Sequence, residues 1–208
     1  MPLSDPLLAA LDHLLAALTS TGRPGTLAPF LAARGGALEG EFEVRSADGR
    51  VRRMQRVRLA LPASLVRAFA HLAPRSNLRI DLATHTLTLW APQELIELQV
   101  GLRWHGFTGK RMGEWDERYV VFAEDGGDPL ALRLDEQDGP TWLSHRGEGR
   151  YAFFAAADSL AQFYEALALR LECPDEAALE RRLRERFGAA AKELWIWKQC
   201  VSRVEARR

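Results

Sequence analysis

The spacing of apolar residues near the start of the chain changes from helical to alternating. Leucines recur at helical intervals over residues 7–18, and Ser4 or Asp5 followed by Pro6 is typical of a helix start. Over residues 41–61, apolar and polar residues alternate on both sides of an Asp-Gly pair. The pattern predicts a helix followed by a β-hairpin whose outer face is rich in arginine.

The central part of the chain is predicted to hold a helix and then a series of short strands. Apolar spacing favours a helix over 61–74, and alternation favours two strands over 78–90 with a turn near residues 83–84. A short helix follows, with Pro92 in its first turn. From residue 118 to 156 we expect a strand, a glycine-containing turn and three further strands.

Helical spacing returns after these strands. Asp158 or Ser159 is expected to cap a helix that Pro174 ends, and the remaining residues are helical by pattern with a break at Gly188. Helix, strands and then helices predict an α+β fold in which a mixed, mostly antiparallel sheet is flanked by helices. We expect residues 1–60 to form an N-terminal helix and hairpin that belong to the same domain as the core. Residues 61–173 are expected to form the core, and residues 174–208 are expected to form a helical C-terminal extension.

Opposite charges are balanced in number but not in position. The chain has 28 basic and 28 acidic residues, so no net charge directs it to nucleic acid or to a membrane. Residues 112–140 hold nine acids against two arginines, whereas residues 181–208 hold nine bases against three acids. We therefore expect an acidic middle and a basic tail.

Several features favour a bacterial protein of the cytoplasm. Only three of the 28 basic residues are lysine and the chain is rich in Ala and Leu, which is typical of GC-rich bacterial genomes. The N-terminus has no basic start, and Asp12 and His13 interrupt its apolar run, which argues against a signal peptide or a membrane span. Cys173 and Cys200 are too isolated to indicate a disulfide framework or a zinc site.

Candidate chemistry centres on the acids of residues 120–147. Asp125 and Asp128 flank a Gly-Gly pair, but the following acids do not match the register of a calcium loop. The two residues could hold Mg²⁺ or act as the carboxylate pair of a hydrolase. Acids beside glycine and proline in a turn are usually solvated, so we expect ordinary pKa values for them.

No other motif indicates catalysis or a cofactor. The histidines lack metal-binding spacing, the serines lack a nucleophile elbow, and no phosphate loop is present. Residues 104–115 are expected to form a long loop between two tryptophans. In the tail, Trp195 and Trp197 are two positions apart, so one ring is expected to pack inward and the other to lie near solvent. The sequence predicts no catalytic residue, no metal site and no cofactor.

The order of several motifs resembles the SUKH superfamily, which is named for a yeast cell-wall-assembly regulator and includes many bacterial immunity proteins. The resemblance covers residues 61–167. It lies in a Leu-Pro helix start, a "WAPQEL" segment, a strand ending in "DGGDP", a "GPTW" strand and a capped amphipathic helix, "ADSLAQFYEAL". The sequence departs from the family in its longer N-terminal part, in the absence of "NGG" after the Leu-Pro helix, and in its tail.

The resemblance implies a SUKH-like α+β domain that binds proteins and is not catalytic. Such domains commonly neutralise a cognate toxin or bind a secretion-system protein. Acids at the rim of the sheet would present negative charge to a basic partner such as the cleft of a nuclease, and an aromatic residue would serve as an anchor. The residues expected to bind the partner are Asp125, Asp128, Asp135, Glu136, Asp138 and Trp142.

Two alternatives remain beside the protein-binding hypothesis. One is a nucleic-acid-binding or regulatory adaptor protein that uses the basic tail and the hairpin arginines Arg45, Arg50, Arg52, Arg53, Arg56 and Arg58. A solvated strand face is the more ordinary interpretation of these arginines, because no aromatic residues lie between them. The other alternative is a hydrolase that uses Asp125 and Asp128.

Overall fold

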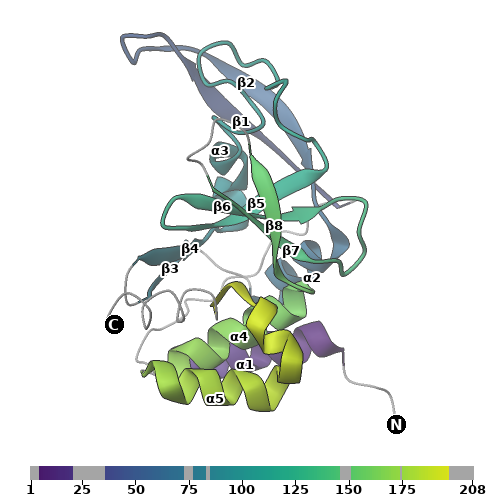
Figure 1. The fold of residues 1–208 in the computed structure, drawn as a ribbon. Coiled ribbons are helices and arrows are strands. Elements are labelled where there is room, and N and C mark those ends of the chain that lie inside the picture. Colours follow the sequence, from purple (N-terminus) through teal and green to yellow (C-terminus); the bar gives the residue numbers. More distant parts are fainter. Residues whose placement is uncertain are drawn as a thin grey trace.

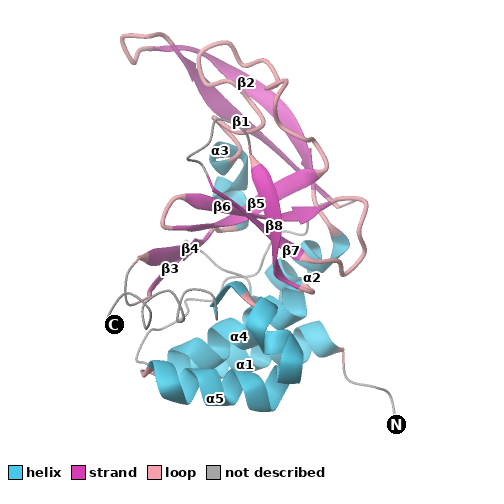
Figure 2. Ribbon diagram, in the orientation of Figure 1, coloured by secondary structure: helices cyan, strands magenta, loops and turns pink. Residues whose placement is uncertain are grey.

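The structure is a computed structural model that describes residues 5–20, 36–72, 77–82, 85–145, 151–173 and 175–196. Helices and antiparallel strands make up an α+β fold, as predicted. Figure 1 shows a two-stranded hairpin at one end, a sheet in the middle and a group of helices at the other end. Figure 2 shows long helices at that end and short helical segments beside the strands.

The helices form where the apolar spacing predicts them. Those described are α1 (Pro6–Ser20), α2 (Ala63–Leu72), α3 (Leu95–Leu98), α4 (Leu160–Glu172) and α5 (Glu176–Phe187), with 3₁₀ turns η1 (Pro92–Glu94) and η3 (Gly188–Glu193). Asp5 begins α1 by accepting a hydrogen bond from the Leu7 amide at 2.9 Å. Ser159 caps α4 in the same way through the Gln162 amide. The leucine stripe of α1 is buried against α4.

The described part of the chain contains a six-stranded antiparallel sheet whose strands follow one another in sequence order. They are β3 (Leu78–Asp81), β4 (Thr86–Leu89), β5 (Tyr119–Asp125), β6 (Asp128–Arg133), β7 (Thr141–His145) and β8 (Ala152–Ala157). β5 and β6 are buried along most of their length, so the core lies around the centre of this sheet. Gly126 and Gly127 join β5 to β6 with φ values of 59° and 96°. The two glycines thus supply the positive φ needed by a two-residue hairpin turn.

A separate hairpin of β1 (Ala37–Arg45) and β2 (Val51–Ala60) extends away from the sheet (Figure 1). Its turn contains the predicted Asp-Gly pair, with Gly49 at φ 82°. The base of the hairpin packs closely on α3, because a Cβ at Gly40 would lie 2.6 Å from Cδ1 of Ile96. The hairpin is therefore fixed at its base and free of the sheet at its far end.

The C-terminal extension packs on the core as far as residue 196. α5 ends at Gly188, which has φ 59° and marks the predicted break. Trp195 is buried, which confirms the inward-packing ring, whereas Trp197 lies outside the described residues. The predicted turn at residues 83–84, the helix end at Pro174 and the second thiol, Cys200, also lie outside them. Cys173 is a buried free thiol.

Candidate functional site

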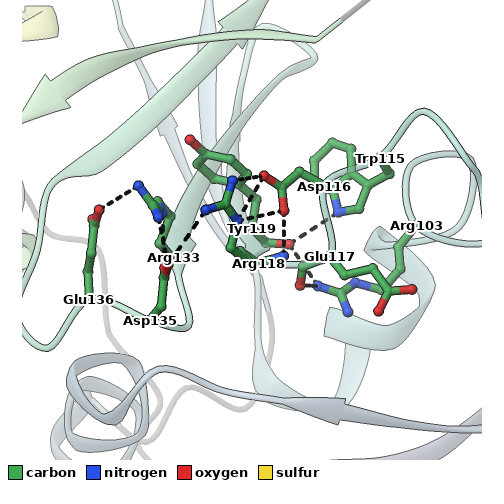
Figure 3. A network of polar contacts seen from close by, with 9 residues as sticks. All are labelled: Arg103, Trp115, Asp116, Glu117, Arg118, Tyr119, Arg133, Asp135 and Glu136. Atoms are coloured by element: carbon green, nitrogen blue, oxygen red, sulfur yellow. Dashed lines mark hydrogen bonds and ion pairs between the residues drawn. The ribbon is translucent and has the colours of Figure 1, made fainter.

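Three of the predicted partner-binding residues lie close together beside the ends of β5 and β6. Asp135 and Glu136 follow β6, and Trp142 lies on the neighbouring strand β7. Figure 3 shows that two arginines, Arg118 and Arg133, stand between these acids and Asp116. We call this group of ion pairs and the rings beneath it the rim cluster.

Arginines neutralise the acids of the rim cluster. Arg133 contacts Asp135 at 2.6 Å and Glu136 at 2.8 Å. Arg118 contacts Asp116 at 2.6 Å and reaches Asp135 at 3.7 Å. The hydrogen bond from Arg133 lowers the pKa of Asp135, and the one from Arg118 lowers the pKa of Asp116. Asp116 and Asp135 thus remain ionised, and the two arginines largely cancel the negative charge locally.

Half-buried aromatic rings support these ion pairs. The Tyr119 ring stacks on Phe153 at 3.9 Å between centroids and meets Trp142 edge-on at 6.0 Å. Arg133 lies over the Tyr119 ring at 5.9 Å. Burial raises the pKa of Tyr119. Trp142, the predicted aromatic anchor, therefore belongs to a packed group of rings at the edge of the core.

A buried arginine ties the neighbouring loop to the start of β5. Arg103 is 8% exposed and donates to the main-chain oxygens of Glu117 and Tyr119 (Figure 3). Its burial lowers its pKa. Trp115 donates its indole N–H to the same Tyr119 oxygen at 3.2 Å. The loop on which Asp116 and Glu117 lie is thereby held in a fixed position beside the sheet.

Asp138 lies apart from the rim cluster and is also paired. Its carboxylate contacts Arg67 at 2.5 Å, and Arg67 contacts Asp5 at 3.0 Å. Arg67 lies on α2 and thus connects the start of α1 with the residues just before β7. The position of Asp138, with a positive φ of 56°, indicates a structural turn residue.

The structure changes the assignment of Asp125. Its side chain is buried, with Oδ2 accepting a hydrogen bond from the Trp195 indole at 2.6 Å and Oδ1 lying 2.5 Å from Nε2 of His85. The expectation of a solvated turn residue was wrong here, because the C-terminal extension covers this end of β5. Asp125 therefore fastens the extension to the core, and we leave it out of the partner-binding surface proposed below.

Asp128 lies across the turn from Asp125 in the β5–β6 register and is half-buried. Both carboxylate oxygens of Asp125 already contact side chains of the same chain, which does not favour a catalytic role for this acid. Across the described ranges, no group of three or more His, Cys, Asp or Glu side chains is placed to hold a metal ion.

A small pocket of about 280 Å³ lies between β8, the start of α4 and η3. Its polar lining includes Asp158 and Gln162, which bond to each other: the Asp158 amide donates to Gln162 Oε1 at 2.6 Å. These bonds belong to the cap of α4. Asp158 and Gln162 are therefore engaged in holding the helix start.

Sequence reasoning missed a second candidate surface, at the far end of the β1–β2 hairpin. Within the described ranges four large apolar residues are exposed, and three of them are here: Val51 at 48%, Met54 at 52% and Phe107 at 58%. We call residues 43–54 together with the loop 105–110 the tip. Exposed apolar residues gathered in one place are typical of interaction surfaces.

The loop at the tip is attached to the hairpin by several contacts. The Arg45 amide donates to the Gly106 oxygen at 3.0 Å, and Arg53 Nη2 donates to the Thr108 oxygen at 3.0 Å. A Cβ at Gly109 would lie 3.1 Å from Val44. The loop was predicted, but its attachment to the hairpin depends on contacts between residues more than fifty positions apart.

Comparison with protein-family models, with curated proteins and with solved structures finds no match to this chain. The resemblance to the SUKH superfamily therefore stays a prediction. Of the helices described, none combines the length and the apolar character needed to cross a membrane.

Proposed function

We propose that this chain is a non-catalytic protein-binding domain, and specifically a bacterial immunity protein that neutralises a cognate secreted toxin. The observation that carries the proposal is the placement of the motifs that resemble the SUKH superfamily. The Leu-Pro helix is α2, the "DGGDP" turn joins β5 to β6, the "GPTW" segment begins β7, and the capped helix is α4. These elements surround one core, as expected if they form a single family-like unit.

The polar groups support a binding role over a catalytic one. Asp125, Asp135 and Asp138 each accept bonds or ion pairs within the chain. Carboxylates engaged in this way hold elements together, and general acid–base catalysis requires groups that can reach a substrate. Exposed apolar residues gather at the tip instead, where a protein partner could cover them.

The proposal is tested by co-expression in a bacterial host. Each gene next to the one encoding this chain is induced alone and together with the full chain, and growth is measured. We expect one neighbouring product to arrest growth and the chain to restore it through a complex that survives purification. If no neighbouring product binds the chain, or if a toxic one is not neutralised, the immunity function is rejected.

A nucleic-acid-binding adaptor is the second candidate, favoured by arginines on the hairpin. Arg52 and Arg58 are exposed and form no ion pair with the residues that the structure describes. This function predicts affinity for DNA or RNA that falls steeply as salt is raised. Fluorescence anisotropy with a labelled DNA duplex and a labelled RNA strand tests it, and absence of binding at low salt rejects it.

A further inference from the structure

We infer that the tip inserts into an acidic, partly apolar cleft of the protein partner. The inference rests on the proposed function, because it assigns the binding surface and the partner chemistry of the same protein-binding domain. It reverses the charge expected from the sequence, which placed acids of this chain against a basic partner.

The tip presents apolar residues on both of its sides. In the β1–β2 register Val44 lies opposite Arg53, and both contact the loop at Gly109. Side chains alternate along a strand, so Met54 points to the side away from the loop. Phe107 lies on the loop itself and is 58% exposed. Met54 and the loop that carries Phe107 therefore lie on opposite sides of the ribbon.

A flat partner surface can cover only one side of a ribbon. Burying Met54 and Phe107 together requires walls on both sides, and the exposed Val51, the first residue of β2, would then lie near the floor of the cleft. Methionine, aromatic residues and arginine are the residue types enriched at the centres of protein interfaces. The arrangement fits insertion into a cleft better than contact with a plane.

The excess of positive charge at the tip favours a cleft lined by acidic residues of the partner. Residues 43–54 and 105–110 hold five bases, Arg45, Arg50, Arg52, Arg53 and Lys110, against two acids, Glu43 and Asp48. The two acids are paired with Arg45 and Arg50. Arg52 and Lys110 are exposed and have no ionic partner in the part of the chain that is described. Carboxylates of a partner would form ion pairs with these two side chains.

The tip is already ordered before it meets a partner. Phe42 stacks on Trp104 at 5.6 Å between ring centroids, which joins the hairpin to the base of the loop. The hydrogen bonds to Gly106 and Thr108 hold the loop further out. A preorganised surface loses little conformational entropy on binding, so a small contact area can still give useful affinity.

A protein partner fits the tip better than nucleic acid. A two-stranded ribbon is narrow enough for the major groove of DNA. However, this end of the ribbon also exposes apolar residues beside its arginines. Apolar Met54 and Val51 have little to contact along a phosphate backbone. Nucleic acid is therefore an outcome of the test that would count against the inference.

The test measures affinity of the purified full chain for the purified product of each neighbouring gene, and for a 20-base-pair DNA duplex. Four variants are compared with the unchanged chain: Met54→Ala, Phe107→Ala, Arg52→Glu and Arg181→Glu. Arg181 is an exposed arginine on α5 without an ionic partner among the described residues, so it is the matched control for Arg52. A fifth variant, Asp135→Asn with Glu136→Gln, changes the rim cluster.

We expect one neighbouring product to bind, and Met54→Ala and Phe107→Ala each to weaken it about tenfold or more. Arg52→Glu should weaken it further, and the Arg181 and rim variants should leave it unchanged. Binding in which only one apolar variant has an effect, or in which the rim variant has the larger effect, overturns the inference and leaves the proposed function standing. Tight binding to DNA also overturns it. Absence of any binding neighbour rejects the proposed function and the inference together.

Discussion

The acid-rich rim cluster and the arginine-rich tip both gather charged residues, but these residues are paired differently within the chain. At the rim cluster, Arg118 and Arg133 lie among the acids and cancel them. At the tip, Arg52 and Lys110 have no counterpart in the described structure, and apolar side chains are exposed beside them. The comparison teaches that charge counted along the sequence does not give surface charge, because pairing in space decides which groups remain available.

Replacing Asp125 by alanine should have the largest effect on stability. The change leaves the buried Trp195 indole N–H without its acceptor and removes the carboxylate that contacts the half-buried His85 ring. We expect the free energy of unfolding to fall by about 3 kcal/mol, measured by urea denaturation. Asp128→Ala, across the same turn, is the control and should cost clearly less. Equal effects would contradict the fastening role of Asp125 and return it to the surface.

Replacing Gly109 by alanine should loosen the tip. Gly109 has φ 70°, and a Cβ there would lie 3.1–3.2 Å from Val44, Arg53 and Gln55. Gly49 has a similar φ of 82° with nothing within 4 Å, so Gly49→Ala measures the conformational cost alone. We expect about 1 kcal/mol for Gly49→Ala and about 2 kcal/mol for Gly109→Ala in thermal unfolding. Equal costs would show that the loop does not press on the hairpin.

A histidine and two glutamates form a third polar group, which lies between helices α1 and α4. We expect this group to make stability depend on pH more than the rim cluster or the tip does. His13 lies 3.0 Å from Glu165 and 2.8 Å from Glu172. Burial lowers the pKa of His13, but the hydrogen bonds to the two glutamates outweigh it and the pKa is raised. Only the protonated ring can donate to both carboxylates. The added stability is complete below the unfolded-state pKa of about 6.5 and is lost as pH rises through the higher folded-state pKa.

The melting temperature of the unchanged chain should therefore fall between about pH 6 and pH 8. His13→Gln should be less stable at the lower pH and should remove most of this fall, as measured by circular dichroism in buffers of matched ionic strength. His71→Gln is the control, because His71 lies beside a single carboxylate, that of Asp12 on α1, among the described residues. A fall of the same size in the His13 variant would contradict the role of this group.

A change in the rim cluster should have the smallest effect on stability, but it should clearly change the pKa of Asp135. Arg133 lowers the pKa of Asp135, so the carboxylate should titrate below its ordinary range in NMR spectra recorded against pH. Arg133→Gln should raise that midpoint toward the ordinary value of about 3.8–3.9. Arg184→Gln, on α5, is the matched control and should leave it unchanged. An ordinary midpoint in the unchanged chain would mean that the acids are not neutralised and could face a basic partner.

Local patterns predicted the elements well because each depends on neighbouring residues. The leucine stripe of α1, the Asp-Gly turn before β2 and the Gly126–Gly127 turn all follow from spacing and backbone preference. The antiparallel pairings of β1 with β2 and of β5 with β6, each across a short turn, follow from the same signals. These features confirm the α+β prediction.

Long-range pairing explains what the sequence did not predict. Asp125 looks like a solvated turn residue until Trp195, seventy positions later, is placed against it. Arg67 reaches Asp138 across a similar separation. The exposed apolar residues of the tip lie on two segments that no local pattern connects, Met54 on β2 and Phe107 on the loop. Neighbouring residues predicted the turn between β5 and β6, but they did not predict the burial of Asp125 or the exposed surface of the tip.

Hydrogen–deuterium exchange on the complex with the neighbouring product tests the central claim most directly. Amide exchange is compared between the free chain and the complex over every segment of the chain. The account predicts slower exchange at residues 43–54 and 105–110, with exchange unchanged at residues 133–143 of the rim cluster. Slower exchange confined to residues 133–143, with the tip unaffected, would contradict it and restore the acid-rich segment as the partner-binding surface.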